Sequence, residues 1–300
     1  MLVLGIETST DYSSVSLVDE NGILAEIRIG RARRHVETVA PSIEALLRVV
    51  DTGIAGVDGV AVDVGPGLFT GLRVGMATAK SLCYALGIRA IAVGSLDVLA
   101  GAVSRTVSVE CLDGWTLLPV VDMKRGGLFW NTYAFDGAAA PTAATAGVAA
   151  GAVIDAAAYI TAPPAPVAAS PPAPAVASPP TPATLLAAGG TRLVATGSPK
   201  LSTPGELVEF LVSAIGSGEL RGKVLMAGNG AMYYAEEFSR LVVHGVKLGG
   251  SMLAVPSAGV LASMGLEKLK VGECVDVGRL SPQYAREPDA IANWKRRDGS

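Results

Sequence analysis

The sequence predicts an α/β protein whose N-terminal third follows the order strand, strand, strand, helix, strand, helix. Half of the residues are hydrophobic but only 5% are aromatic, so small and aliphatic side chains dominate, as in tightly packed α/β proteins. Short apolar or alternating runs are followed by segments with apolar residues every three or four positions, the spacing of amphipathic helices. A glycine-rich turn at 65–75 joins one strand to the helix behind it.

Each element follows from the spacing of its apolar residues. Runs at 2–7, 13–18 and 23–29 are apolar or alternating and are separated by turns, which predicts an antiparallel meander. The next elements are expected to be a helix at 36–50, a strand at 57–64, a helix at 70–86, a strand at 89–93 and a short helix at 95–103. Further along, we expect strands at 116–121, 128–135, 192–195 and 223–227 and helices at 204–215, 231–243 and 257–271.

A change of composition divides the chain. Between residues 138 and 191 the only charged residue is Asp155, and prolines crowd the stretch 161–182. Such a segment predicts a disordered, Ala/Pro-rich insertion that neither forms a core nor continues a sheet. We therefore expect an N-terminal lobe at 1–104, a C-terminal lobe made of 105–137 and 192–300, and an insertion at 138–191.

Charge and composition exclude several classes of protein. A net charge of -3 argues against a chain that mainly binds nucleic acid non-specifically. Three scattered cysteines favour a reducing, cytoplasmic setting, and no uncharged stretch is apolar enough to predict a membrane span. His35 and His244, the only histidines, are far apart, which argues against a metal site or a hydrolase.

Two polar segments could meet a phosphate. The cluster at 7–11 follows the first strand, although a hairpin turn rich in Ser and Thr is the simpler interpretation. The loop at 65–75 leads into a helix N-terminus, where free N–H groups attract anions and Thr70 could cap them. It is not a P-loop, because the Gly-Lys-Ser/Thr ending is missing.

Small residues recur every fourth position in the helix after this loop. Gly67, Gly71, Gly75 and Ala79 leave one face almost without side chains, so another backbone must approach it closely. The chain's own sheet, a neighbouring helix or another subunit could do so, and this feature alone favours internal packing.

Basic residues gather before the first helix. Arg28, Arg31, Arg33 and Arg34 place four guanidinium groups within seven residues, either as a solvated patch or as a contact for RNA or an acidic partner. His35 is expected at the surface or as a helix cap, and Arg125 at a charged hairpin tip.

Four ordered motifs together resemble the TsaB (YeaZ) family. They are residues 4–10 (LGIETST), 65–75 (GPGLFTGLRVG), 122–126 (DMKRG) and 282–290 (PQYAREPDA). The resemblance implies the fold of the actin, sugar kinase and Hsp70 superfamily (ASKHA). It also implies a bacterial subunit of the machinery that makes threonylcarbamoyladenosine (t6A) beside the anticodon of tRNAs that read ANN codons. Glu7, Gly127 and Ala285 depart from the usual family residues.

The resemblance also implies partners. In that family the paralogue TsaD holds the metal and transfers the threonylcarbamoyl group, and the ATPase TsaE docks on the assembled pair. The two histidines of the TsaD metal motif align with Ser95 and Leu99 here. The chain is therefore expected to be a non-catalytic activator of TsaD with no tightly bound cofactor, ATP and metal belonging to its partners and tRNA being contacted indirectly. The alternatives are an ATPase, phosphotransferase or peptidase acting alone, and a homodimer through the same helices.

The residues expected to have a functional role fall into three groups. The partner interface on helices 36–50 and 70–86 would use Val36, Val39, Ile43, Leu47, Gly71, Gly75, Ala79 and Leu82. A vestigial nucleotide cleft would use Thr8, Ser9, Asp11, Gly65, Gly67 and Thr70, and contacts to tRNA or a partner would use Arg28, Arg31, Arg33, Arg34, His35 and Arg125. Leu47→Glu and Gly75→Leu are expected to break assembly without unfolding the chain.

Overall fold

A five-stranded mixed sheet forms the centre of the first lobe. The computed structural model describes residues 1–30, 34–106, 114–136, 184–186, 192–220 and 223–283. The sheet has the order β3-β2-β1-β4-β5, in which β1 to β3 form an antiparallel meander and β1, β4 and β5 run parallel. The strands are β1 (Val3–Glu7), β2 (Ser13–Asp19), β3 (Gly22–Ile29), β4 (Gly59–Asp63) and β5 (Arg89–Val93). Every residue of β1 and β4 is buried, as expected for strands covered on both faces.

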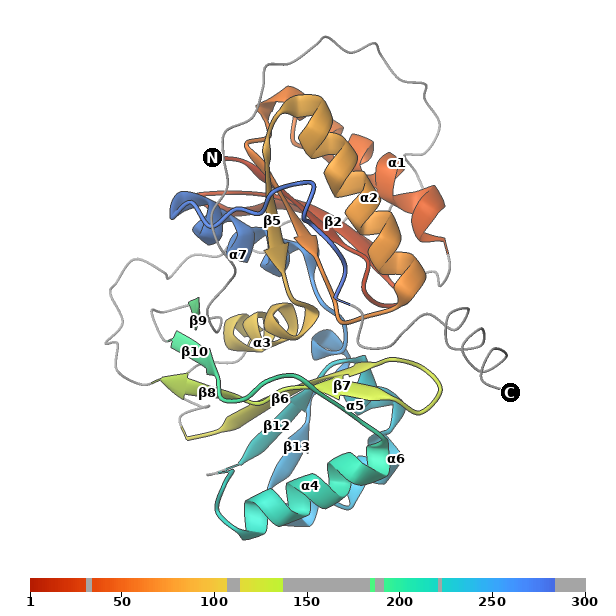
Figure 1. The fold of residues 1–300 in the computed structure, drawn as a ribbon, viewed down its shortest axis with the longest axis vertical. Helices are drawn as coiled ribbons and strands as arrows, with labels where there is room; N and C mark the ends of the chain where they lie inside the picture. Colours follow the sequence, from red (N-terminus) through yellow and green to blue (C-terminus); the bar gives the residue numbers. More distant parts are fainter. Residues whose placement is uncertain (31–33, 107–113, 137–183, 187–191, 221–222, 284–300) are drawn as a thin grey trace.

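Helices cover both faces of this first sheet. α1 (His35–Val49) and α2 (Phe69–Leu86) pack on one face, and α7 (Ala258–Lys270) packs across β1, β2 and β4 on the other (Figure 1). The close approach of α7 requires a glycine in β1, because a Cβ at Gly5 would collide with the carbonyl oxygen of Ala258. The helix predicted near the C-terminus therefore belongs with the first sheet, although sequence order groups it with the second lobe.

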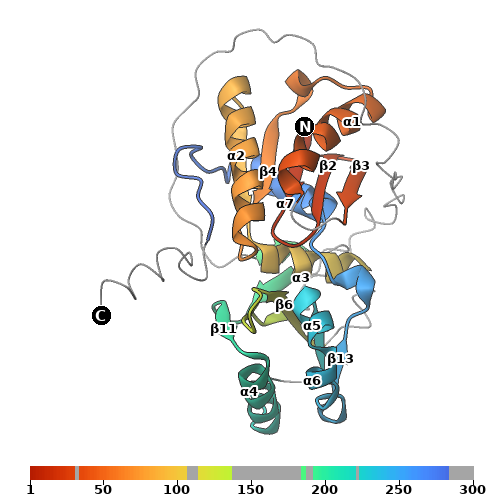
Figure 2. The same cartoon turned by 90° about the vertical axis from the view of Figure 1, so that its right-hand side faces the viewer.

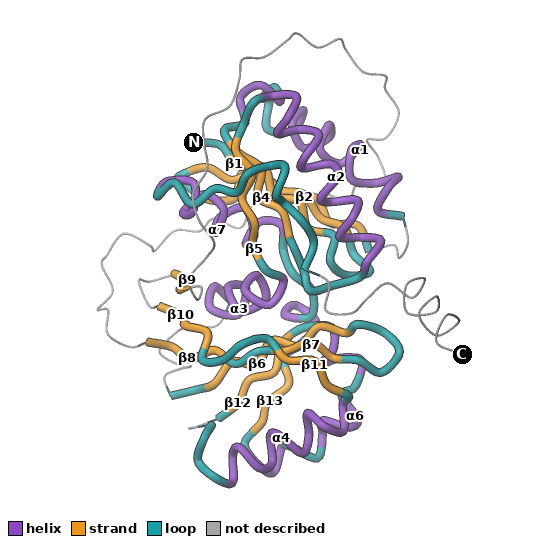
Figure 3. Tube along the Cα trace, viewed as in Figure 1, coloured by secondary structure: helices purple, strands orange, loops and turns teal. Residues whose placement is uncertain are grey.

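The second lobe contains the remaining strands. Its sheet runs β11-β7-β6-β8-β10-β9, with β12 beside β6 and β13 beside β12. The bounds are β6 (Thr116–Asp122), β7 (Leu128–Trp130), β8 (Tyr133–Asp136), β9 (Thr184–Leu186), β10 (Arg192–Ala195), β11 (Lys200–Ser202), β12 (Val224–Ala227) and β13 (Val246–Leu248). Three helices pack against it: α4 (Pro204–Gly216), α5 (Asn229–Tyr233) and α6 (Ala235–Ser239). Figure 3 shows α4 and α6 on the side of this sheet away from α3.

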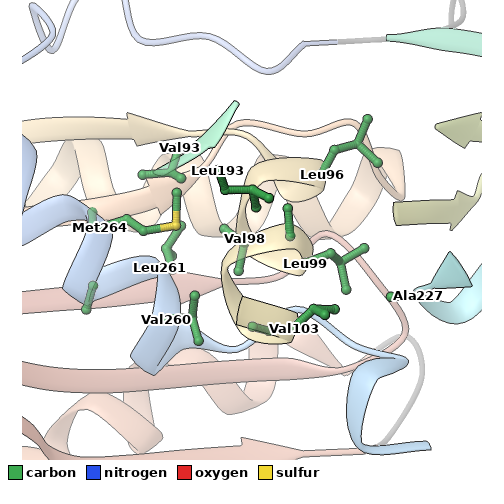
Figure 4. Close-up of a cluster of buried hydrophobic side chains, with 14 of the residues drawn as sticks. Val93, Leu96, Val98, Leu99, Val103, Leu193, Ala227, Val260, Leu261 and Met264 are labelled. Atoms are coloured by element: carbon green, nitrogen blue, oxygen red, sulfur yellow. The ribbon is translucent and has the colours of Figure 1, made fainter. Parts of the chain in front are cut away.

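One helix and one hydrophobic core join the lobes. α3 (Ser95–Thr106) lies between the two sheets in both views (Figures 1 and 2). Its Leu99 and Val103 pack in the same cluster as Val260 and Leu261 of α7 and Ala227 of β12 (Figure 4). Because the cluster is continuous between the lobes, the lobes are held together by buried apolar surface as well as by polar contacts.

The predicted fold class is confirmed: an α/β chain with two lobes and a β-β-β-α-β-α order in the first. Three details were wrong. The run at 128–135 is split into β7 and β8, the helix at 231–243 is α5, α6 and a 3-10 turn, and the short strands β11 and β13 were not predicted. Strands of three residues, such as β11 and β13, are too short for periodicity to identify.

The insertion prediction is partly corrected. Thr184–Leu186 lies within 138–191, yet it pairs antiparallel with β10 and so extends the second sheet. Residues 138–183 and 187–191 lie outside the described residues, and the predicted domain boundaries stay predictions. In the part of the chain that the structure describes, no helix is long and apolar enough to cross a membrane.

Candidate functional site

Two buried carboxyl groups lie side by side where β1 and β4 end. Glu7 and Asp63 are the last residues of these neighbouring parallel strands, and their exposed fractions are 1% and 0%. Glu7 Oε1 accepts hydrogen bonds from the backbone N–H (2.7 Å) and hydroxyl (2.6 Å) of Ser9. Asp63 Oδ1 accepts from the N–H of Gly65 (2.6 Å) and the hydroxyl of Ser95 (2.7 Å).

The second oxygen of each carboxyl group is buried as well. No donor in the described residues reaches Glu7 Oε2 or Asp63 Oδ2. Burial, the negative charge of Asp63 and the contact with its carboxyl group raise the pKa of Glu7 well above its ordinary value. The buried pair therefore favours the protonated form of Glu7.

The glycine-rich loop packs directly on the turn after β1. The N–H of Leu68 donates to the carbonyl oxygen of Ser9 (2.6 Å), and a Cβ at Gly67 would collide with that same carbonyl group. Thr8 and Ser9 are fully buried at this contact, which we call the sealed junction and define as residues 7–10 with 63–68. Of the six residues predicted for a nucleotide cleft, Thr8, Ser9, Gly65 and Gly67 belong to it, whereas Thr70 is exposed and Asp11 faces the second lobe. Whether these residues form a vestigial nucleotide cleft stays a prediction.

Internal packing explains the small-residue face of α2. A Cβ at Gly71 would collide with the carbonyl oxygen of Thr8, and a Cβ at Gly75 with its hydroxyl. Ala79 is buried in the core of the first lobe. These three residues therefore lie against the chain's own first strand, and the expectation that they form part of a partner surface is corrected. Thr70 does not cap α2 either, because the helix begins at Phe69 without a side-chain cap.

The opposite side of α2 borders an open apolar groove. The groove has a volume of about 460 Å³ and is lined by α1 and α2 through Val36, Val39, Ala40, Phe69, Thr70, Arg73, Val74, Ala77 and Thr78. Val36 is 73% exposed, and the Arg73 guanidinium lies 3.7 Å from the centre of the Phe69 ring. Of the predicted interface residues, Val36 and Val39 line the groove, Ile43 is buried, and Leu47 and Leu82 are partly buried against the core.

The basic residues do not form one site. Arg28 pairs with Glu26 (3.1 Å) and Arg34 with Glu37, while Arg31 and Arg33 lie outside the described residues. His35 is buried rather than exposed, and its Nε2 donates to the carbonyl oxygens of Thr10 (3.0 Å) and Tyr12 (3.1 Å). Arg125 lies in the β6–β7 loop, far along the chain from the others. Whether these residues contact tRNA stays a prediction.

Two features were missed from the sequence. The Glu7–Asp63 pair could have been found, since an acidic residue ends each of two apolar strands that a parallel sheet would place together. The second is an ion pair between Asp11 and Lys124, which joins the two lobes and for which the sequence offers no signal.

Comparisons with known proteins identify relatives of the chain. The family model described as TsaD, tRNA N6-adenosine threonylcarbamoyltransferase, matches residues 20–191. TsaB of Bacillus subtilis, a tRNA threonylcarbamoyladenosine biosynthesis protein, is 30% identical over 135 residues, which is 45% of this chain and 56% of the relative. An uncharacterised protein of Mycobacterium tuberculosis H37Rv is 37% identical over 133 residues, 44% of this chain and 58% of its own length. The chain thus spans a little over half the length of these relatives.

A solved structure shares the fold. YeaZ from Pseudomonas aeruginosa superposes with a TM-score of 0.60 at 20% identity, covering 94% of this chain and 99% of its own. The chain therefore shares the fold of YeaZ, and the assignment of that fold to the ASKHA superfamily stays a prediction.

Proposed function

The chain belongs to the TsaD family, as the TsaB (YeaZ) resemblance of its motifs predicts, and from this premise we propose that it is a non-catalytic subunit of t6A synthesis. In this role it binds TsaD and enables transfer of the threonylcarbamoyl group to the adenosine beside the anticodon of tRNAs that read ANN codons. Because tRNA is modified in the cytoplasm, we also propose that the chain works there.

The groove between α1 and α2 is the observation that carries the proposal. Val36 of α1 is 73% exposed, and Phe69 and Val74 of α2 also line the groove, so the groove leaves hydrophobic surface in water. Covering such surface with a partner helix is favourable by about 25 cal/mol for each Å² removed from water. Arg73 also lines the groove, so a positive charge lies beside the apolar surface.

The residues in place of the TsaD metal ligands support a non-catalytic role. The hydroxyl of Ser95 is already bonded to Asp63, and Leu99 packs in the core between the lobes. Neither side chain offers an imidazole to a metal ion. We therefore propose that the metal belongs to TsaD and ATP hydrolysis to TsaE, which joins the assembled pair, and that tRNA is contacted mainly through these partners.

The test is light scattering after size exclusion on the chain alone and mixed with TsaD of the same organism, with transfer activity assayed on each fraction. We expect a heterodimer peak that alone carries activity. Val36→Glu should weaken the complex at least about tenfold, because it places a charge in the groove. Val271→Glu is the matched control, since Val271 is also 73% exposed but follows α7.

Three outcomes would contradict the proposal. No complex at micromolar concentration, together with ATP or peptide hydrolysis by the chain alone, would identify an enzyme instead. A homodimer that TsaD does not dissociate would assign the groove to a second copy. If Val36→Glu and Val271→Glu weaken TsaD binding equally, the interface does not lie on α1 and α2.

A further inference from the structure

A lysine of the second lobe reaches the first lobe. Lys124 lies in the β6–β7 loop, and its Nζ is 2.8 Å from Asp11 Oδ2 in the turn between β1 and β2. The same Nζ is 3.3 Å from Asp122 Oδ2 and 4.6 Å from the centre of the Tyr233 ring, at the end of α5. One ammonium group is thus shared between a carboxylate of each lobe, with an aromatic ring beside it.

The backbone around Lys124 holds this position. The N–H of Lys124 donates to Asp122 Oδ1 (2.9 Å), and the N–H of Met123 donates to the carbonyl oxygen of Gly127 (2.9 Å), which closes the loop. Lys124 and Arg125 have φ angles of 62° and 54°, in the left-handed region that side chains other than glycine rarely adopt. The loop therefore directs the lysine across the gap between the lobes.

The turn that contains Asp11 is also bound to α1. His35, the first residue of α1, donates from Nε2 to the carbonyl oxygens of Thr10 (3.0 Å) and Tyr12 (3.1 Å), on either side of Asp11. One residue further along, the hydroxyl of Ser13 lies 3.0 Å from that of Thr38 in α1. The first turn of the helix and the β1–β2 turn are therefore expected to move together.

The same helical turn lines the groove. The groove residues of α1 are Val36, which follows His35 directly, and Val39 and Ala40, which lie about one turn further, so all three closely follow this anchor. These contacts are continuous. Lys124 forms an ion pair with Asp11, the carbonyl groups of the residues on either side of Asp11 accept hydrogen bonds from His35, and His35 directly precedes Val36.

We propose that Lys124 is a latch between the lobes that fixes the first turn of α1 and thereby the shape of the groove. The inference rests on the proposed function, because the partner in the groove is TsaD. With the latch closed, the Thr10–Tyr12 turn is held against the second lobe and the groove is preformed. A contact on the second lobe that draws Lys124 away from Asp11 frees the turn and loosens the groove. The Lys124–Asp11 ion pair and the groove are therefore coupled.

The test compares Lys124→Met with Lys200→Met. The first variant keeps an apolar stem beside Tyr233 and removes the charge that reaches Asp11. The second is a matched control, because Lys200 Nζ lies 4.5 Å from the Phe210 ring centre and 5.1 Å from that of Trp130, all in the second lobe. Hydrogen exchange of a peptide spanning 35–43 is measured on each chain alone, and affinity for TsaD is measured separately.

We expect Lys124→Met to speed exchange in the first turn of α1 about fivefold and to weaken TsaD binding by a similar factor, with no such change in Lys200→Met. Asp11→Asn should reproduce both effects, and the double variant should add little to either single one, since the two residues act through one contact.

Hydrogen exchange, measured on each chain alone, tests this inference independently of the proposed function. Unchanged exchange in Lys124→Met overturns the latch whether or not TsaD binds. Faster exchange throughout the chain in both lysine variants also overturns it, because the effect is then general destabilisation. If wild type does not bind TsaD, the proposed function fails, and the exchange result alone decides whether Lys124 fixes α1.

Discussion

The two sides of α2 meet very different surroundings. One side presents Gly71 and Gly75 to the backbone and hydroxyl of Thr8 so closely that no side chain fits between them. The other presents Phe69, Val74 and Ala77 to an open groove shared with α1. The glycine spacing in the sequence correctly indicated a close approach, yet it carried no information about which surface approaches. Changes on the sealed side should therefore cost stability, and changes on the open side should cost binding.

The largest effect is expected at Gly75. Gly75→Leu places a branched side chain where even a Cβ would overlap the Thr8 hydroxyl, so β1 or α2 must shift. We expect a loss of about 3 kcal/mol in the free energy of unfolding, measured by urea denaturation. This replaces the expectation that the variant would fold normally and fail only in assembly. Wild-type stability of Gly75→Leu would show that the contact between α2 and β1 can accommodate a side chain at this position.

The buried pair in the sealed junction should make stability depend on pH. The folded-state pKa of Glu7 is raised, so its contribution is fully present below the unfolded pKa and is lost as pH rises through the folded value. Glu7→Gln cannot ionise and can still donate to Asp63. Relative to this variant, wild type should lose up to about 1.4 kcal/mol of stability for each pH unit within that window.

Urea midpoints from pH 4.5 to 9 measure this difference. Glu209→Gln, at an exposed position of α4, is the control and should follow wild type at every pH. Parallel stability curves for wild type and Glu7→Gln would mean that the pKa of Glu7 is not raised in the folded chain.

The smallest effect on folding is expected on the open side. Ala77 is exposed in the same helix as Gly75, so Ala77→Glu should change stability by less than about 0.5 kcal/mol. It should still weaken TsaD binding about tenfold, because a carboxylate would be buried in an apolar contact. Calorimetry and light scattering on one preparation separate the two effects. Normal binding by this variant would move the partner away from the groove.

The sequence predicted the first lobe better than the second. The helices and strands of the first lobe are long enough for periodicity to identify them, and 89–93 matched β5 at both ends. In the second lobe, β11 and β13 have three residues each and depend on pairing with distant strands, which local patterns do not report.

The same limit applies to the candidate site. The apolar residues Val36, Val39 and Ile43 could be chosen from amphipathic spacing, although that spacing does not show that Val36 is exposed while the other two are buried. The burial of Leu47 and Gly75 could not, since it depends on the register of α1 and α2 against the sheet, and Leu47→Glu would also disturb the core. His35 was expected at the surface, yet carbonyl groups of a turn more than twenty residues earlier hold it inside.

The pairing of β9 has a consequence for the evolution of this chain. β8 ends at Asp136, β9 begins at Thr184, and both are neighbours of β10, so the two ends of the intervening stretch lie about 10 Å apart in one sheet. Closing a loop on such fixed ends costs only about 0.6 kcal/mol more for each doubling of its length. Insertions and deletions between these strands should therefore be nearly neutral to selection, and related chains are expected to differ most in length at this point.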